Sequence, residues 1–173
     1  METMKILQIV GFKNSGKTTL MNRFIESAQE AGQTVSAIKH HGHGGPPELP
    51  DRETDSMKFL GSGAASSLVF GNGVVQMHMQ GQKKELSNFI KLSLLADPDC
   101  ILIEGFKQAS YPKIVLVRSQ EEWRQLKGLD NIRLVIVPHP MLLDGAQPVL
   151  RDDRSSIDSF FTVWMEGDFH ETV

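Results

Sequence analysis

The most constraining feature of this sequence is a phosphate-loop pattern near its start. Gly11, Gly16, Lys17 and Thr18 match the pattern G-x-x-x-x-G-K-[ST]. Residues 6–10 before it form a short apolar run of the buried-strand type, and the residues from Thr18 onward have helical spacing. Because a phosphate-binding loop needs a strand before it and a helix after it, we predict that the chain binds a phosphorylated ligand here.

The residue types in this loop suit the phosphates of a nucleotide. Gly11 lets the chain turn off the strand where a side chain would clash, and the backbone N–H groups of the loop can then point inward as a nest for phosphate oxygens. The start of the helix adds free N–H groups and the positive end of its dipole. Lys17 can reach the β- and γ-phosphates, and the Thr18 hydroxyl can take one coordination site on Mg²⁺. Lys13 and Asn14, which lie inside the loop, can supply further hydrogen-bond donors to the phosphates.

The composition fits one globular domain over residues 1–173. The chain is 40% hydrophobic, its net charge of −3 does not mark a nucleic-acid binder, and it has no apolar run long enough to span a bilayer. We find no signal peptide at the N-terminus, and the lone cysteine, Cys100, cannot form an internal disulfide. We therefore expect a reducing, cytoplasmic location, and we interpret Cys100 as a small buried hydrophobe.

The hydrophobic patterns predict an α/β fold. A helix over Thr18–Ala31, ended by Gly32, and a strand over Val35–Ile38 complete the β-loop-α-β unit that opens a parallel sheet. Further strands are predicted over Cys100–Ile103, Lys113–Val117 and Ile132–Val137, and further helices from Ser87, over Glu121–Leu126 and over Ser155–Trp164. The tail after Gly167 is expected to be loose. The predicted fold class is a P-loop NTPase, with a mostly parallel sheet flanked by helices.

A β-hairpin extension is predicted at about residues 65–80. Ser66–Phe70 and Val74–Gln80 have strand character, and G-N-G between them is a hairpin signal. We expect this antiparallel pair to be attached to the parallel sheet and to offer an edge for dimerisation.

The loop Lys39–Asp51 follows the second strand and contains His40, His41 and His43. These histidines can ligate a metal, contact an anion such as phosphate, or serve in a proton relay. Their spacing is not that of a zinc site, and a solvated loop that happens to be rich in histidine is the simpler alternative.

Two acids are candidates for magnesium binding and catalysis. Residues 51–56 are predicted to start a helix that runs to about Leu60, and Asp55 within it can hold Mg²⁺ through water or orient an attacking water. Glu104 ends the apolar strand after Cys100, as a Walker B acid does, and can lie beside the Mg²⁺ held by Thr18. The usual acid is aspartate, so direct and water-mediated coordination both stay open. Each acid can alternatively be an ordinary carboxylate, at a helix start or at a strand end.

Four segments in this order resemble the MobB family of molybdopterin-guanine dinucleotide biosynthesis proteins: V-G-F-K-N-S-G-K-T-T-L, I-K-H-H-G-H-G-G, T-D-S and L-I-E-G-F-K. The similarity runs from about Met4 to Val117 and is weaker afterwards. Many members have a lysine just before the aspartate of the D-S pair, where this chain has Thr54.

The resemblance implies a cytoplasmic, homodimeric, GTP-binding protein with at most weak GTPase activity. Such proteins assist the partner MobA in attaching GMP to molybdopterin, and the molybdopterin cofactor itself is a possible ligand. The implied nucleotide site is Gly11 to Thr19, including Ser15, and the implied magnesium site involves Thr18, Asp55 and Glu104. The sequence itself gives no base preference, since P-H-P stands where guanine-binding switch proteins often carry [NT]-K-x-D.

Two other functions stay open on sequence grounds. A small-molecule kinase would need an arginine-rich lid, and only Arg118 and Arg124 occur between Gly105 and Leu129. A metallochaperone GTPase would use the histidine loop to load a metal.

Overall fold

The computed structural model describes residues 3–42, 45, 47–80, 85–167 and 171–172. The chain divides into two compact units, one of residues 1–40 with 86–173 and one of residues 41–85. Among the described helices, none is long and apolar enough to cross a membrane.

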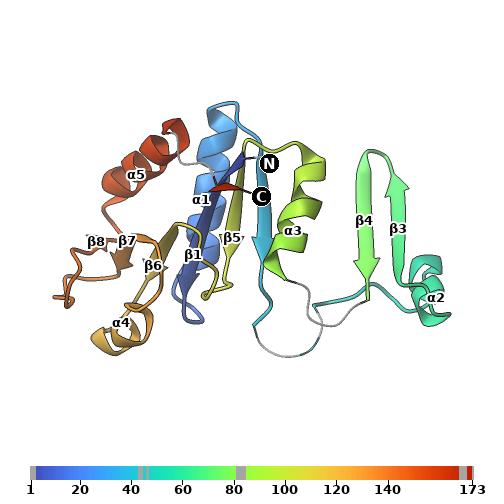
Figure 1. The fold of residues 1–173 in the computed structure, drawn as a ribbon, viewed down its shortest axis with the longest axis horizontal. Coiled ribbons are helices and arrows are strands. Elements are labelled where there is room, and N and C mark those ends of the chain that lie inside the picture. Colours follow the sequence, from blue (N-terminus) through green and yellow to red (C-terminus); the bar gives the residue numbers. More distant parts are fainter. Residues whose placement is uncertain (1–2, 43–44, 46, 81–84, 168–170, 173) are drawn as a thin grey trace. The chain divides into compact units, whose positions relative to one another are not determined.

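The larger unit is built on a mostly parallel sheet with the strand order β2-β5-β1-β6-β7-β8, and β9 pairs antiparallel with β1 (Figure 1). Its strands are β1 (Thr3–Gly11), β2 (Val35–Lys39), β5 (Cys100–Glu104), β6 (Lys113–Leu116), β7 (Ile132–Val137), β8 (Val149–Leu150) and β9 (Glu171–Thr172). Its helices are α1 (Lys17–Glu30), α3 (Leu86–Ser93) with the short 3₁₀ turn η1 (Leu94–Ala96), α4 (Gln120–Leu126) and α5 (Arg154–Glu166). The predicted fold class is confirmed.

Helices cover both faces of this sheet, so its central strands are apolar on both sides. Leu7 and Ile9 of β1 pack with α1 and α5, where the rings of Phe24 and Phe161 stack 4.1 Å apart. Ile6 on the opposite face packs with α3. Cys100 is completely buried in this core, and burial raises the pKa of its thiol to about 12. The interpretation of Cys100 as a buried hydrophobe is confirmed.

The predicted loose tail is wrong for Glu171–Thr172, which form β9 against the first residues of β1. The reason is that β6 pairs with β1 only from Gln8 onward, so one edge of the earlier residues of β1 is open for another strand. The two-residue strand β8 was not predicted, because so short a segment carries no periodic signal.

The smaller unit contains α2 (Asp55–Gly61) and an antiparallel hairpin of β3 (Ser66–Gly71) and β4 (Val74–Met79). Asn72 and Gly73 join the strands with φ angles of 46° and 78°, as the predicted hairpin turn requires. The expected attachment to the parallel sheet is wrong, since β3 and β4 form a sheet of their own. The chain passes through a loop and α2 between β2 and β3, and the two hairpin strands then pair only with each other among the described residues.

Helix α2 also starts later than predicted, at Asp55 rather than at Asp51. The Asp51 carboxylate accepts a hydrogen bond from the Glu53 N–H, and its carbonyl accepts from the Thr54 N–H and hydroxyl. These bonds close a turn that leaves Thr54 extended, so helical geometry begins one residue later.

Candidate nucleotide-binding site

The predicted phosphate loop connects β1 to α1 at the edge of the sheet where the parallel strands end (Figure 1). A side chain at Gly11 would lie 2.6 Å from the Ser15 Oγ and 2.7 Å from the Leu116 carbonyl oxygen, so only glycine fits. Asn14 and Gly16 take left-handed conformations, with φ angles of 60° and 96°. The loop therefore has the tight curvature that aims backbone N–H groups inward.

The first turn of α1 presents N–H groups at this loop. Gly16 is the N-cap and supplies no side-chain cap, and the N–H of Leu20 is the first to bond back to the Gly16 carbonyl. The N–H groups of Lys17, Thr18 and Thr19 precede that bond, so they are the helix donors that an anion can accept.

Lys17 lies folded over the loop, where its Nζ donates to the Phe12 carbonyl at 2.7 Å. Partial burial lowers the pKa of Lys17, and the positive charges of Lys107, Lys39 and Arg118 lower it further, while Glu104 opposes them. The lysine thus sits in a locally cationic setting in a chain whose net charge is −3. A phosphate group would be attracted to this cluster.

Glu104 meets Thr18 at the edge of the sheet. Because β5 pairs in parallel with β1, with Glu104 opposite Ile9, the end of β5 lies beside the loop that follows β1. The Thr18 hydroxyl donates to the Glu104 Oε2 at 2.9 Å, and the Lys39 Nζ lies 3.5 Å from the same oxygen. Glu104 is only 8% exposed, so it is not a solvated strand-end carboxylate.

The turn after Glu104 is held by a residue that the sequence patterns did not single out. Gln8, fully buried in β1, donates from its Nε2 to the carbonyls of Gly105 and Phe106, both at 3.0 Å. Gly105 and Phe106 both have left-handed φ angles, of 94° and 50°. The available signal was a lone polar residue within the apolar run 6–10, because buried polar groups need partners.

Among the three histidines of the loop Lys39–Asp51, His40 is placed beside this turn. The His40 N–H donates to the Glu104 carbonyl at 2.9 Å, and its ring packs against Phe106 at 4.8 Å between centroids. His41 belongs to the smaller unit, and His43 lies outside the described residues. The described residues hold no group of three or more metal-ligating side chains. The roles of His40 and His41 in binding a cofactor stay predictions.

The remaining predicted residues are placed as follows. Lys13, Asn14 and Thr19 are exposed on the loop and on α1, whereas Ser15 is buried beneath the loop. Asp55 is an exposed residue at the start of α2, in the smaller unit, and its magnesium and catalytic roles stay predictions.

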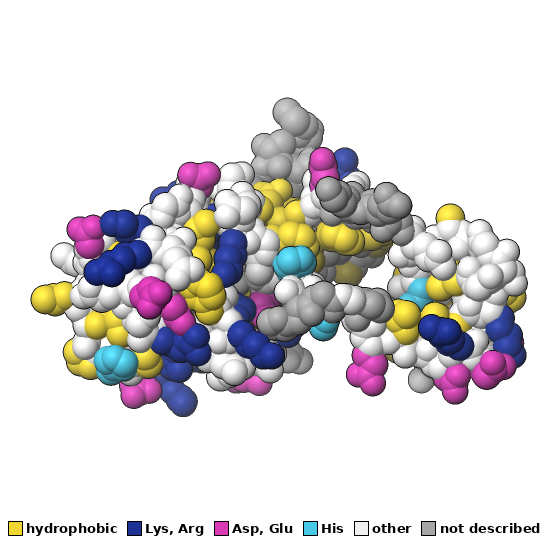
Figure 2. Space-filling view, turned by 90° about the horizontal axis from the view of Figure 1, so that it is seen from below, with side chains coloured by type: hydrophobic (Ala, Val, Ile, Leu, Met, Phe, Trp, Pro, Cys, Tyr) yellow, Lys and Arg dark blue, Asp and Glu magenta, His cyan; other side chains and the backbone are white. Residues whose placement is uncertain are grey.

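Further cations lie on the same edge of the larger unit, where Figure 2 shows Lys and Arg side chains across the surface. The Lys107 Nζ lies 4.0 Å from the centre of the Phe12 ring, and the Arg151 Nη2 donates to the Ser15 carbonyl at 2.8 Å. Sequence patterns missed Arg151, because it is 136 positions away from Ser15 and belongs to no motif.

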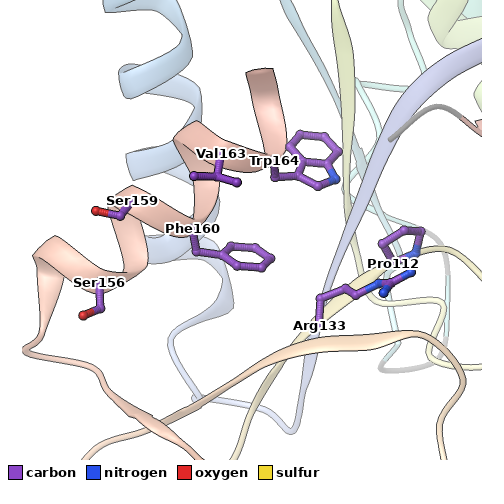
Figure 3. A pocket seen from close by; sticks show the side chains of 7 residues that line it. All are labelled: Pro112, Arg133, Ser156, Ser159, Phe160, Val163 and Trp164. Carbon is purple, nitrogen blue, oxygen red and sulfur yellow. The ribbon is translucent and has the colours of Figure 1, made fainter. Parts of the chain in front are cut away.

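A separate cavity of about 380 Å³ lies between α5 and the strand starts (Figure 3). It is lined by Pro112, Arg133, Ser156, Ser159, Phe160, Val163 and Trp164. Pro112 precedes β6, and Arg133 is the second residue of β7. These positions place the cavity towards the sheet edge opposite the phosphate loop, so it is not part of the nucleotide site.

Comparison with known proteins places this geometry in a family. Residues 6–137 match the family model described as MobB, molybdopterin guanine dinucleotide synthesis protein B. The chain is 39% identical to a Bacillus subtilis protein named as a probable molybdopterin-guanine dinucleotide biosynthesis adapter protein, over 75% of each chain. It is 32% identical to the molybdopterin-guanine dinucleotide biosynthesis adapter protein of Haemophilus influenzae, over 80% of this chain and 78% of that one.

The fold agrees with these sequence matches. The crystal structure of Bacillus subtilis MobB superposes with a TM-score of 0.78 and 35% identity, covering 95% of this chain and all of the other. The family match covers the phosphate loop, Glu104 and the strands that bring them together. On these grounds, the chain belongs to the MobB family.

Proposed function

We propose that this protein binds GTP and Mg²⁺ at its phosphate loop and acts as an adapter in molybdenum cofactor biosynthesis. It would assist a MobA-type guanylyltransferase in attaching GMP to molybdopterin, in the cytoplasm. The observation that carries the nucleotide part is the contact between Thr18 and Glu104 at 2.9 Å, directly beneath a phosphate loop. The biosynthetic role is supported by the adapter names of the relatives.

The residues present fit a magnesium ion. The Thr18 hydroxyl and the Glu104 carboxylate offer oxygen atoms, the donor type that Mg²⁺ prefers, and both reach one point beside the loop. When bound, the ion would neutralise charge on the outer phosphate oxygens.

The chain's own residues would hold the phosphates. Lys17 would leave the Phe12 carbonyl, to which it now donates, and turn to the β- and γ-phosphates. The N–H groups of the first turn of α1 would bond the phosphate oxygens that lie over the loop. Since the sequence offers no evident water-orienting glutamine beside the loop, we expect slow hydrolysis and a role that depends on binding.

The hairpin supports a homodimer. Its exposed apolar side chains would be costly to leave in water, and they lie along two strands with unpaired edges among the described residues. They are Leu68, Val69, Phe70, Val74, Val75, Met77 and Met79. A second copy of the hairpin would cover them with matching apolar surface.

Reconstitution tests the proposed role. A MobA-type enzyme, GTP, Mg²⁺ and molybdopterin are mixed with and without this protein, and the guanine dinucleotide product is quantified. We expect more product with the wild-type chain than with Lys17→Ala. Lys127→Ala is the matched control, since Lys127 pairs with Asp144 on the surface. Equal product with and without the wild-type protein would refute the adapter role.

A further inference from the structure

Arg151 reaches the phosphate loop from the far end of the chain. It follows β8 directly, and its N–H donates to the Val137 carbonyl at 2.7 Å, which continues the pairing of β8 with β7. Because β7 and β8 run parallel to β1, this places Arg151 at the sheet edge that carries the loop. Its Nη2 then donates to the Ser15 carbonyl at 2.8 Å.

One face of the Arg151 guanidinium covers Gly16. A Cβ built on Gly16 would lie 3.6 Å from the Arg151 Cζ, 3.8 Å from its Nε and 3.8 Å from its Nη1. Such similar distances to three atoms of one plane put that point above the face of the group and not beside its edge. The face towards Gly16 is therefore occupied, while the Arg151 residue as a whole is only partly buried.

The charge of Arg151 has no carboxylate partner within ion-pair distance among the described residues, unlike those of Arg23 and Arg118. The Arg151 Nε is buried, and it has no hydrogen-bond partner among the residues that the structure describes. The nearby Asp153 carboxylate instead caps α5, where it accepts from Ser155 and Ser156. A cation held in this way carries a free-energy cost that a bound anionic nucleotide would offset.

The strand order says which end of a nucleotide Arg151 would meet. β5 and β8 lie on opposite sides of β1 in the sheet. Thr18 and Glu104 mark the metal and outer-phosphate end on the β5 side, so the nucleoside end extends toward the β8 side. We propose that Arg151 is a nucleotide-binding residue whose face away from Gly16 packs against the nucleoside, while its Nη2 holds the loop. This inference rests on the proposed nucleotide binding, and it uses the stacking of planar guanidinium groups on bases.

Calorimetry with two ligands tests this assignment. GTP and inorganic tripolyphosphate are titrated with Mg²⁺ into the wild type, Arg151→Ala, Arg151→Lys and Arg133→Ala. Tripolyphosphate presents the phosphate chain without a nucleoside. Arg133→Ala removes the same charge near the opposite edge of the sheet, away from the loop.

Arg151→Ala should weaken the binding of GTP about tenfold, which is the effect of losing one stacking contact on a base. The same variant should weaken the binding of tripolyphosphate less than about threefold. Arg151→Lys should also weaken GTP, since lysine keeps the charge but lacks the planar face. Arg133→Ala should leave both affinities unchanged. If circular dichroism shows that Arg151→Ala does not fold, Arg151→Lys is used instead to compare the loss of GTP affinity with the loss of tripolyphosphate affinity.

If Arg151→Ala lost equal affinity for GTP and for tripolyphosphate, the proposed contact with the nucleoside would be refuted, because Arg151 would then act only through the loop. Unchanged GTP affinity in Arg151→Ala would overturn it as well. A wild type that binds neither ligand would instead refute the nucleotide site itself, so the two failures are distinguishable.

Discussion

Replacing Gln8 by methionine tests how the turn that carries Glu104 is held. Methionine has nearly the length of glutamine but lacks the Nε2 donor that bonds the Gly105 and Phe106 carbonyls. Losing two hydrogen bonds at about 0.5–1.5 kcal/mol each costs about 1–3 kcal/mol. Removal of the Gln8 Oε1, which is buried without a partner among the described residues, offsets part of this cost. We expect a net loss of about 1–2 kcal/mol in the free energy of unfolding, or about 2–8 °C in Tm for a chain of this size.

The same substitution should weaken magnesium binding. Phe106 is held in a left-handed conformation that is unfavourable for a bulky residue, so the turn should relax once its carbonyls lose their donor. Glu104 would then shift relative to Thr18, and GTP binding should need several-fold more Mg²⁺.

Urea unfolding and a magnesium titration of GTP binding measure the two effects of Gln8→Met. The matched control is Gln120→Met, since Gln120 is exposed and its Nε2 donates to the Leu142 carbonyl at 2.8 Å. It should change stability by less than about 0.5 kcal/mol. If Gln8→Met matches this control in stability and the wild type in magnesium dependence, the reasoning about the turn is refuted.

Three further predictions follow from local geometry. Gly11→Ala would put a methyl group 2.7 Å from the Leu116 carbonyl oxygen; it should destabilise the chain by about 1–3 kcal/mol in urea unfolding, whereas Gly128→Ala, with open space around it, should not. Phe70→Asp should turn a dimer into a monomer in analytical ultracentrifugation, because it places a charge on a side chain that is 71% exposed in the apolar hairpin; a persistent dimer would contradict the proposed interface. Because burial raises the pKa of the Cys100 thiol from 9.0 to about 12, the unfolded chain loses this proton first as the pH rises. The wild type should therefore lose stability relative to Cys100→Ala between about pH 9 and 12, and parallel curves would contradict the burial argument.

The sequence was sufficient where function depends on local patterns. The glycines, Lys17 and Thr18 are contiguous, so their motif and the flanking strand and helix could be recognised without any tertiary information. Glu104 could be placed beside Thr18 because parallel strands end at one edge of a sheet, which is a rule of topology. Both inferences needed only the positions of strand ends.

What the sequence patterns missed depends on pairing between distant segments. β9 pairs with the first residues of β1, whose edge is open there because β6 pairs with β1 only from Gln8 onward. Arg151 belongs to no motif, and its contact with Ser15 follows from the pairing of β8 with β7. The hairpin itself was predicted from its turn residues, but its attachment to the parallel sheet was not a local property and was predicted wrongly.

The most direct test of the central claim is calorimetric titration of GTP and ATP, with and without Mg²⁺, into the wild type, Lys17→Ala and Glu104→Gln. We predict that GTP binds better than ATP and needs Mg²⁺. Lys17→Ala should weaken binding by about 1.5–3 kcal/mol, roughly tenfold or more, through loss of a charged phosphate contact. Glu104→Gln should mainly reduce the effect of Mg²⁺. Unchanged affinity in Lys17→Ala, identical magnesium titrations in Glu104→Gln, or a preference for ATP would contradict the account.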